Sequence, residues 1–164
     1  MKPLLLKGHE RSITFIKYHR EGDLLFTCSK DHSPTVWRSD TGERLGTYDG
    51  HTGAVYQVDV TRESAGRVCE GWAPMRATAR QFCIAGDSKL LLSASADPSV
   101  RLWDVETGRS LFEWPHKGAV RSVVWAEGER EFVTCSDPFG MTVPATINVF
   151  AFADEKEKQV RGSM

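Results

Sequence analysis

The amino-acid sequence predicts an all-β protein, a β-propeller of about three four-stranded blades. A set of residues repeats along the chain, and the apolar segments between the repeated residues are short and rich in β-branched and aromatic side chains. Helical periodicity is absent. A repeating unit of about 42 residues with four short strands is typical of one propeller blade.

The repeat begins with a glycine and a histidine and ends near a tryptophan, with an aspartate before the tryptophan. The repeated residues are Gly8, His9, Asp31 and Trp37 in the first unit and Gly50, His51, Asp97 and Trp103 in the second. This order and spacing are typical of WD40 repeats. A third unit begins at His116 and ends on a degenerate segment, residues 147–151.

The expected strands follow the apolar runs in chain order. These runs are residues 13–16, 24–27, 55–58 and 120–124. Valine, isoleucine, threonine, tyrosine and phenylalanine suit the pleated surface of a strand, so each run predicts one strand.

The repeats also predict the domain organisation. Residues 1–153 are expected to hold WD40 repeats, with blade one at about 8–48, blade two at about 50–114 and blade three at about 116–152. Residues 1–7 are expected to form the outer strand of a closing blade, and residues 154–164 a charged tail. Because a ring of this class usually needs roughly 4–8 blades, we expect the chain to be a fragment or a truncated product.

Blade two is longer than blade one, and the surplus lies between its first and second strands, at roughly residues 62–85. This segment contains four arginines and no lysine. One interpretation is an added binding loop, on whose arginines direct RNA binding would depend. The other is a flexible excursion, or translated non-coding sequence.

The likeness to WD40 repeats implies that the repeated polar residues form a hydrogen-bonded network inside each blade. Its members are His9, Thr27, Asp31 and Trp37 in blade one and His51, Ser93, Asp97 and Trp103 in blade two. Pairing each buried donor with an acceptor avoids a cost of about 1–3 kcal/mol per unpaired group. A hydrolase triad would instead need one activated nucleophile in a cleft, whereas this set recurs blade by blade. The sequence therefore predicts no catalytic residue and no enzyme.

Composition narrows the possible ligands further. The net charge of −1 argues against direct nucleic-acid binding. The sequence contains no phosphate-binding loop, so no nucleotide cofactor is predicted. One histidine per blade lacks the close spacing of zinc ligands, so no metal site is predicted.

No apolar run approaches the roughly 18 residues of a membrane span, and a cytoplasmic location is expected. Four cysteines without a CxxC pair predict reduced thiols, with Cys28 and Cys135 packed in the core.

Three strings are more specific than the repeat itself: MKPLLLKGHER at residues 1–11, DTGERLGTY at 40–48 and SDPFGM at 136–141. In these strings the chain resembles the i subunit of eukaryotic translation initiation factor 3, a WD40-repeat family. The resemblance implies a seven-bladed, non-catalytic scaffold that docks the b subunit, contacts the g subunit and reaches the small ribosomal subunit through the complex. There it would support mRNA recruitment and start-codon scanning.

The resemblance assigns no partner-binding residue, and two other classes of function remain open. A signalling adaptor, such as a kinase-receptor-associated protein, would have the same fold. An enzyme built on a propeller would need a non-repeating polar cluster in a cleft, and the sequence shows none.

Overall fold

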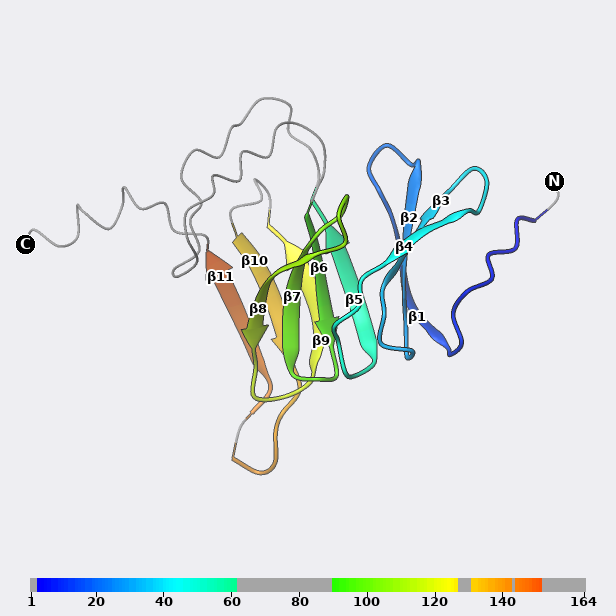
Figure 1. Cartoon of the computed structure of the whole chain (residues 1–164). Coiled ribbons are helices and arrows are strands. Elements are labelled where there is room, and N and C mark those ends of the chain that lie inside the picture. The colour runs from blue at the N-terminus through cyan, green and yellow to red at the C-terminus, as the bar shows by residue number, and fades with distance from the viewer. Residues whose placement is uncertain (1–2, 62–89, 127–130, 143, 152–164) are drawn as a thin grey trace, which may run out of the picture.

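The computed structural model describes residues 3–61, 90–126, 131–142 and 144–151 of the 164-residue chain. All regular secondary structure in these residues is β-strand, and the strands form three antiparallel sheets that stand side by side (Figure 1). This arrangement confirms the predicted all-β fold class and is consistent with consecutive propeller blades.

The first sheet contains four strands that pair in chain order. They are β1 (Ile13–Tyr18), β2 (Leu24–Ser29), β3 (Thr35–Arg38) and β4 (Arg44–Thr47). The turn between β3 and β4 contains Gly42, whose φ of +73° lies in the left-handed region that favours glycine. Gly108 takes the same place in the second sheet, with a φ of +69°. The left-handed backbone at this turn thus explains why a glycine recurs there.

The second sheet repeats this arrangement in β5 (Val55–Val60), β6 (Leu90–Ser95), β7 (Ser99–Asp104) and β8 (Ser110–Pro115). Its register also repeats, because Val60 pairs with Leu91 as Tyr18 pairs with Leu25. Both first strands carry a bulge just after their first residue. The predicted insert, residues 62–85, lies outside the described residues, and the strands on either side of it keep the register of blade one.

The third sheet holds three strands in the described part of the chain, not the four that were expected. They are β9 (Val120–Trp125), β10 (Glu131–Ser136) and β11 (Thr146–Ala151), in the order β11-β10-β9. The predicted tail, residues 154–164, is not among the described residues. Residues 3–7 form no strand. The outer strand predicted at residues 1–7 would complete a blade that the described residues do not contain.

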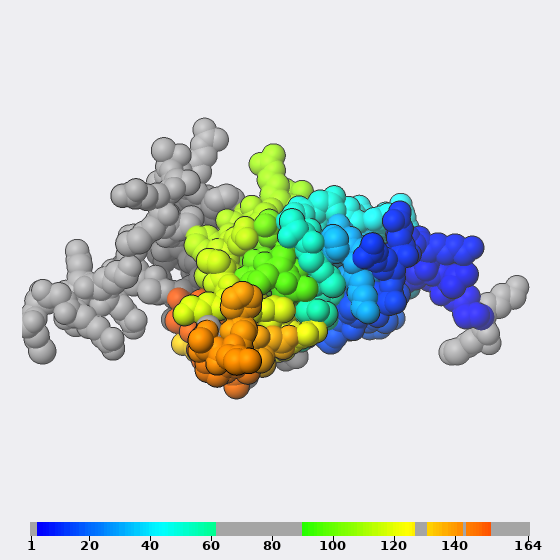
Figure 2. Space-filling model, turned by 90° about the horizontal axis from the view of Figure 1, so that it is seen from below, coloured from blue at the N-terminus to red at the C-terminus, as the bar shows by residue number. Residues whose placement is uncertain are grey.

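Two clusters of buried side chains hold the sheets together, face to face. β5 packs against β1 and β2, and β9 packs against β5 and β6. The cluster between the first two sheets includes Phe26, Val36, Tyr48, Val58 and Trp103. The cluster between the second and third sheets includes Leu92, Leu102, Val123 and Phe132. Figure 2 shows the N-terminal residues at one side of this row of sheets and the third sheet toward the other.

One sequence-based expectation about the core is wrong. Cys28 is buried, as predicted, but Cys135 is exposed. Both residues are the fifth of the second strand in their sheets, β2 and β10. The face of the first sheet that carries Cys28 is covered by the second sheet, whereas the corresponding face of the third sheet has no described neighbour.

Candidate functional site

A polar cluster in the second sheet joins four side chains through hydrogen bonds. The Nε1–H of Trp103 donates to Ser93 Oγ at 2.8 Å. Ser93 Oγ lies 2.7 Å from His51 Nε2, and His51 Nδ1 lies 2.7 Å from Asp97 Oδ2. With its proton on Nδ1, the His51 ring accepts from Ser93 and donates to Asp97. Strands β6 and β7 supply Ser93 and Trp103, while the turn before β7 supplies Asp97.

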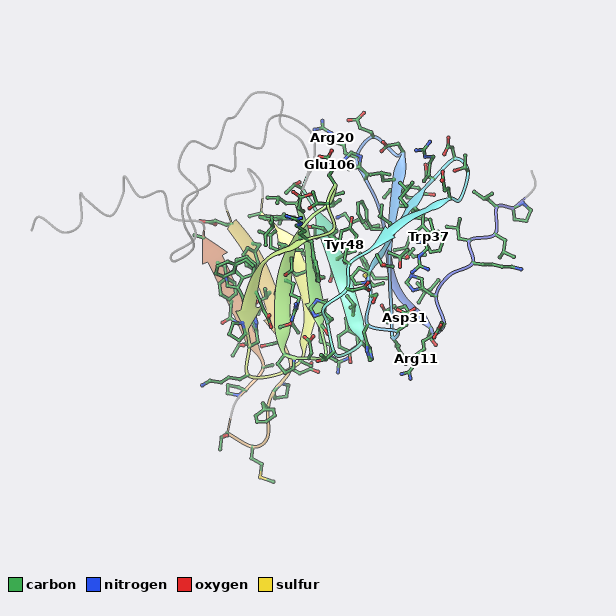
Figure 3. The ribbon with its side chains drawn as sticks, in the orientation of Figure 1. Arg11, Arg20, Asp31, Trp37, Tyr48 and Glu106 are labelled. Atoms are coloured by element: carbon green, nitrogen blue, oxygen red, sulfur yellow. The ribbon has the colours of Figure 1, made fainter. Side chains whose placement is uncertain are left out.

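The first sheet repeats this chain of contacts with a threonine in place of the serine. Trp37 Nε1–H donates to Thr27 Oγ1 at 2.8 Å, and Thr27 Oγ1 lies 2.6 Å from His9 Nε2. His9 Nδ1 lies 2.7 Å from Asp31 Oδ2. Figure 3 shows Trp37 on the first sheet and Asp31 nearer the lower end of the same sheet. The structure thus brings together, blade by blade, all eight residues named in the sequence analysis.

Backbone groups complete the carboxylate end of each network. Asp97 Oδ2 accepts the N–H of Thr52 at 3.0 Å, and Asp97 Oδ1 accepts the Ser99 hydroxyl at 2.6 Å. In blade one, Asp31 Oδ2 accepts the N–H of Glu10 at 3.2 Å. Each aspartate therefore ties the loop that carries the histidine to the turn between the second and third strands.

The third sheet contains only the histidine–hydroxyl part of the network. His116 Nε2 lies 3.0 Å from Thr134 Oγ1, while His116 Nδ1 lies 3.0 Å from the backbone oxygen of Trp114. The tryptophan position is occupied by Phe150. Its ring lies edge to face with the His116 ring, with 5.6 Å between the ring centroids. A phenylalanine has no N–H to donate, so the indole contact of the other two blades is lost here.

The electrostatics of the network favour ionised aspartates. Burial would raise the pKa of Asp97, but hydrogen bonds from His51 and Ser99 outweigh it and hold this pKa far below its usual value. Burial also raises the pKa of Asp31, but the hydrogen bond and charge of His9, together with the backbone N–H groups of Glu10 and Ser33, outweigh it and lower this pKa. Both carboxylates are therefore charged acceptors. Charged acceptors form stronger hydrogen bonds than neutral acceptors do.

The Ser93, His51 and Asp97 side chains have the connectivity of a hydrolase triad, but their surroundings differ from those of a nucleophile. Ser93 is fully buried, and its hydroxyl oxygen already accepts the indole N–H of Trp103. A nucleophilic hydroxyl must reach a substrate carbonyl, which burial under Trp103 prevents. The arrangement is suited to fixing the loop and turn against the strands.

A second polar contact, which the repeat pattern did not reveal, joins all three sheets. The Asp59 carboxylate in β5 lies 2.7 Å from Lys17 Nζ in β1 and accepts the backbone N–H of Trp125 in β9 at 2.8 Å. Asp59 is 5% exposed, so both contacts form in a largely buried place. A buried carboxylate needs such partners, because leaving it unpaired would be costly.

Further contacts across sheet boundaries add to this link. Thr14 donates its hydroxyl hydrogen to the backbone oxygen of Val55, and Tyr48 does the same to Val105. Burial raises the pKa of the Tyr48 hydroxyl, which stays protonated and able to donate. Figure 3 shows Tyr48 between the first and second sheets. A tyrosine in the sequence could have suggested such a bridge, but no spacing rule identifies its acceptor.

An open groove of about 540 Å³ lies between the first two sheets, lined by β4 and the turn from β7 to β8. Leu45 and Tyr48 line one side, and Val105 and Glu106 the other. Glu106 is the only carboxylate in this lining, and the paired acid and base that catalysis would require are not present there.

Among the described residues, no group of three or more histidine, cysteine, aspartate or glutamate residues could hold a metal ion. No helix there is long and apolar enough to cross a membrane. The Cys28 thiol is buried, which raises its pKa, with a further contribution from the charge of Asp31, and keeps it in the unreactive protonated form.

Comparison with known proteins agrees with this geometry. The family described as "WD domain, G-beta repeat" matches residues 2–38 and 77–104, which include the tryptophans of both complete networks. The first match ends at Arg38, directly after Trp37, and the second ends at Asp104, directly after Trp103.

The chain also matches proteins named "Eukaryotic translation initiation factor 3 subunit I". It is 38% identical over 150 residues to the one from Schizosaccharomyces pombe, an alignment that covers 92% of this chain and 38% of the relative. It is 51% identical over 122 residues to the Danio rerio protein, covering 74% of this chain and 30% of the relative. The Xenopus tropicalis protein is 43% identical over 157 residues, with coverage of 96% and 35%.

The chain thus spans about a third of the length of these relatives. The repeated sheets, the repeated networks and the identities all lead to one conclusion. This chain carries WD40 repeats and is homologous, over part of their length, to the proteins named subunit I of eukaryotic translation initiation factor 3.

Proposed function

We propose that this chain acts as a non-catalytic scaffold in initiation of protein synthesis, binding other subunits of translation initiation factor 3. The observation that carries the proposal is its identity of 38–51% to proteins that bear the name of a factor 3 subunit. By the family resemblance, its partners are the b and g subunits, with the small ribosomal subunit reached through the complex. Its place of action is the cytoplasm, where translation initiation takes place.

The internal chemistry of the blades supports a binding role. We propose that the networks around Thr27 and Ser93 are structural, because both hydroxyls are buried and already bonded to an indole N–H. The groove beside Tyr48 lacks an acid and base pair. A rigid set of sheets with variable edges is the usual platform for protein contacts in repeat proteins.

The charge of the chain supports protein partners over direct contact with RNA. The chain has 21 basic and 22 acidic residues, whereas a surface that binds phosphates usually has a marked basic excess. We therefore place mRNA and ribosomal RNA contacts on other members of the assembly.

The proposal is tested by affinity purification of the tagged 164-residue chain from a eukaryotic cell extract, followed by mass spectrometry. The expected result is recovery of other factor 3 subunits together with small-subunit ribosomal proteins. A tagged His51→Ala chain is the control, since loss of the buried imidazole should weaken blade two and reduce recovery of these partners. Recovery of a kinase or receptor set would refute the scaffold in favour of the signalling adaptor, and recovery of chaperones alone would refute both.

A further inference from the structure

The groove between the first two sheets continues into a second hollow. Its first part, of about 540 Å³, has Leu45 and Tyr48 on one side and Val105 on the other. Its second part, of about 470 Å³, lies between the β1–β2 loop and the β3–β4 turn, and Leu24 lines both parts. We call the two parts together the inter-blade groove, because its walls come from two consecutive blades inside the chain.

The floor of the inter-blade groove is apolar. Val36 and Tyr48 belong to the core cluster between the first two sheets, and Leu24 and Val105 pack against that cluster. Leu45 in β4 is 43% exposed. The core between these sheets thus reaches the surface here, in a hollow within the range of roughly 300–1,000 Å³ that is usual for ligand clefts.

The rim of the inter-blade groove is acidic. Glu21, Asp23 and Asp40 line its second part, together with a single base, Arg38. Arg38 lies 4.0 Å from Glu43, so its charge already faces a carboxylate. The Asp23 side chain is 65% exposed, and Glu21 and Asp40 are exposed as well. These three carboxylates, which we call the acidic rim, attract cationic side chains from solvent.

Two arginines close to the groove leave the charge of the acidic rim in place. Arg44 is the cross-strand partner of Trp37, and its Cδ lies 3.6 Å from the Cβ that a side chain at Gly8 would have. This is the face of the first sheet opposite to Val36 and the groove, because successive residues of a strand point to opposite faces. Figure 3 shows Arg20 and Glu106 at the same end of the sheets, so we count this base and acid against each other.

We propose that the inter-blade groove is the docking site for a basic segment of a protein partner that also carries a leucine or an aromatic residue. The apolar side chain enters the part beside Leu45 and Val105, while lysine or arginine side chains lie against the acidic rim. Apolar contact supplies most of the affinity, and the charge pairs orient the segment. This inference rests on the proposed scaffold function, since it describes the chemistry of one partner segment.

A protein segment fits this groove better than the other classes of ligand do. An acidic rim repels phosphate groups, which argues against a nucleic acid as the occupant. A metal ion would need converging ligands, and the described residues contain no group of three or more that could hold one. Two adjoining hollows with an apolar floor and a charged rim match the usual anatomy of a protein–protein contact.

Peptide selection on the full 164-residue chain tests the docking site without a known partner. Random nine-residue peptides displayed on phage are selected on the wild-type chain. The expected sequences combine two or more lysines or arginines with a leucine or an aromatic residue. Each selected peptide is then labelled with fluorescein and titrated by fluorescence polarisation. Its affinity should fall several-fold between roughly 50 and 300 mM salt, because exposed charge pairs are screened.

Two substitutions locate the binding site, each with a matched control. Leu45→Ala removes apolar surface from the groove and should weaken peptide binding about tenfold, whereas Val124→Ala, at a residue of similar exposure in β9, should not. Glu21→Lys reverses one charge of the acidic rim and should weaken binding roughly tenfold at low salt. Its control, Glu131→Lys in β10, should leave the affinity unchanged. All four residues are exposed, so far-UV circular dichroism should show the wild-type β-sheet signal in every variant.

Other occupants of the groove give different results. Peptides that bind only after deletion of residues 62–85 would show that a segment of the same chain fills the groove. A doubled chain mass in light scattering that Leu45→Ala abolishes would identify a second copy as the occupant. Either result would overturn the proposal of a partner segment.

The proposal is also overturned if Leu45→Ala and Glu21→Lys both leave peptide binding unchanged, or if the selected peptides lack basic residues. Neither result affects the recovery of factor 3 subunits by the wild-type chain, which tests the scaffold function. Groove-dependent binding of basic peptides without recovery of these subunits would refute the scaffold function and keep the docking site. The two failures are therefore distinguishable.

Discussion

Replacement of Ser93 by alanine tests the role of the buried networks most directly. The Ser93 hydroxyl accepts the indole N–H of Trp103 at 2.8 Å and lies 2.7 Å from His51 Nε2. Its removal leaves the Trp103 donor and the His51 acceptor without this partner. Trp103 and His51 are both buried, so water does not readily replace the lost hydroxyl as their partner.

The expected loss follows from these two groups. A buried donor or acceptor without a partner costs about 1–3 kcal/mol, so two such groups set a range of about 2–6 kcal/mol. Because neighbouring effects are not additive, we expect a loss of about 3 kcal/mol in the free energy of unfolding. For a chain of this size, that loss corresponds to a fall of roughly 6–12 °C in melting temperature.

Urea unfolding followed by tryptophan fluorescence measures this loss, with Ser110→Ala as the control. Ser110 begins β8 and is exposed, so its replacement should change the free energy of unfolding by less than about 0.5 kcal/mol. Trp103→Phe removes the indole N–H, and Ser93→Ala should cost about 1–2 kcal/mol less in that background. The structural role would be refuted by a folded Ser93→Ala chain as stable as the Ser110→Ala control.

Three further predictions concern other contacts. The pKa of Asp97 is lowered on folding from its ordinary value of 3.8. The ionised carboxylate therefore stabilises the fold above that pH, and this stabilisation is lost as the pH falls toward the folded pKa. Thermal melts between about pH 3 and 7 should show a steeper fall in melting temperature toward acid pH for wild type than for Asp97→Asn. Gly53→Ala would place a Cβ 2.7 Å from the backbone nitrogen of Asp97 and should lower the melting temperature by several degrees, whereas Gly46→Ala, whose Cβ meets nothing closer than 3.8 Å, should not; equal melting temperatures would contradict this. Asp59→Asn should destabilise the chain by roughly 1–3 kcal/mol in urea unfolding, and a loss that is unchanged in a Lys17→Met background would show that the two side chains are not coupled.

The sequence could predict the networks because each member is a distinctive residue type at a repeated spacing. Ser93 and Thr27 differ in type, but both carry the hydroxyl that the indole and imidazole require. The sheets that hold them follow from β-branched and aromatic runs of the right length. The likeness to WD40 repeats could therefore indicate the partners of His9 and His51.

Contacts between blades could not be predicted in the same way. Asp59 lies at a position where blade one has Lys17, so the repeat does not mark it as a polar site. Its partners come from the sheets on either side, and their approach depends on how the sheets pack. Cys135 shows the same limit, because its strand position indicated burial while the actual burial depends on a following blade.

The long connection within blade two has a consequence for the order of folding. β1 ends at Tyr18 and β2 begins at Leu24, whereas β5 ends at Val60 and β6 begins at Leu90. Both pairs reach the same register, but the second must close a connection that is roughly sixfold longer, at an added entropic cost of about 1.6 kcal/mol. Pairing in the first sheet should therefore nucleate earlier, and its face carrying Phe26 then provides the apolar surface on which β5 and β6 can meet.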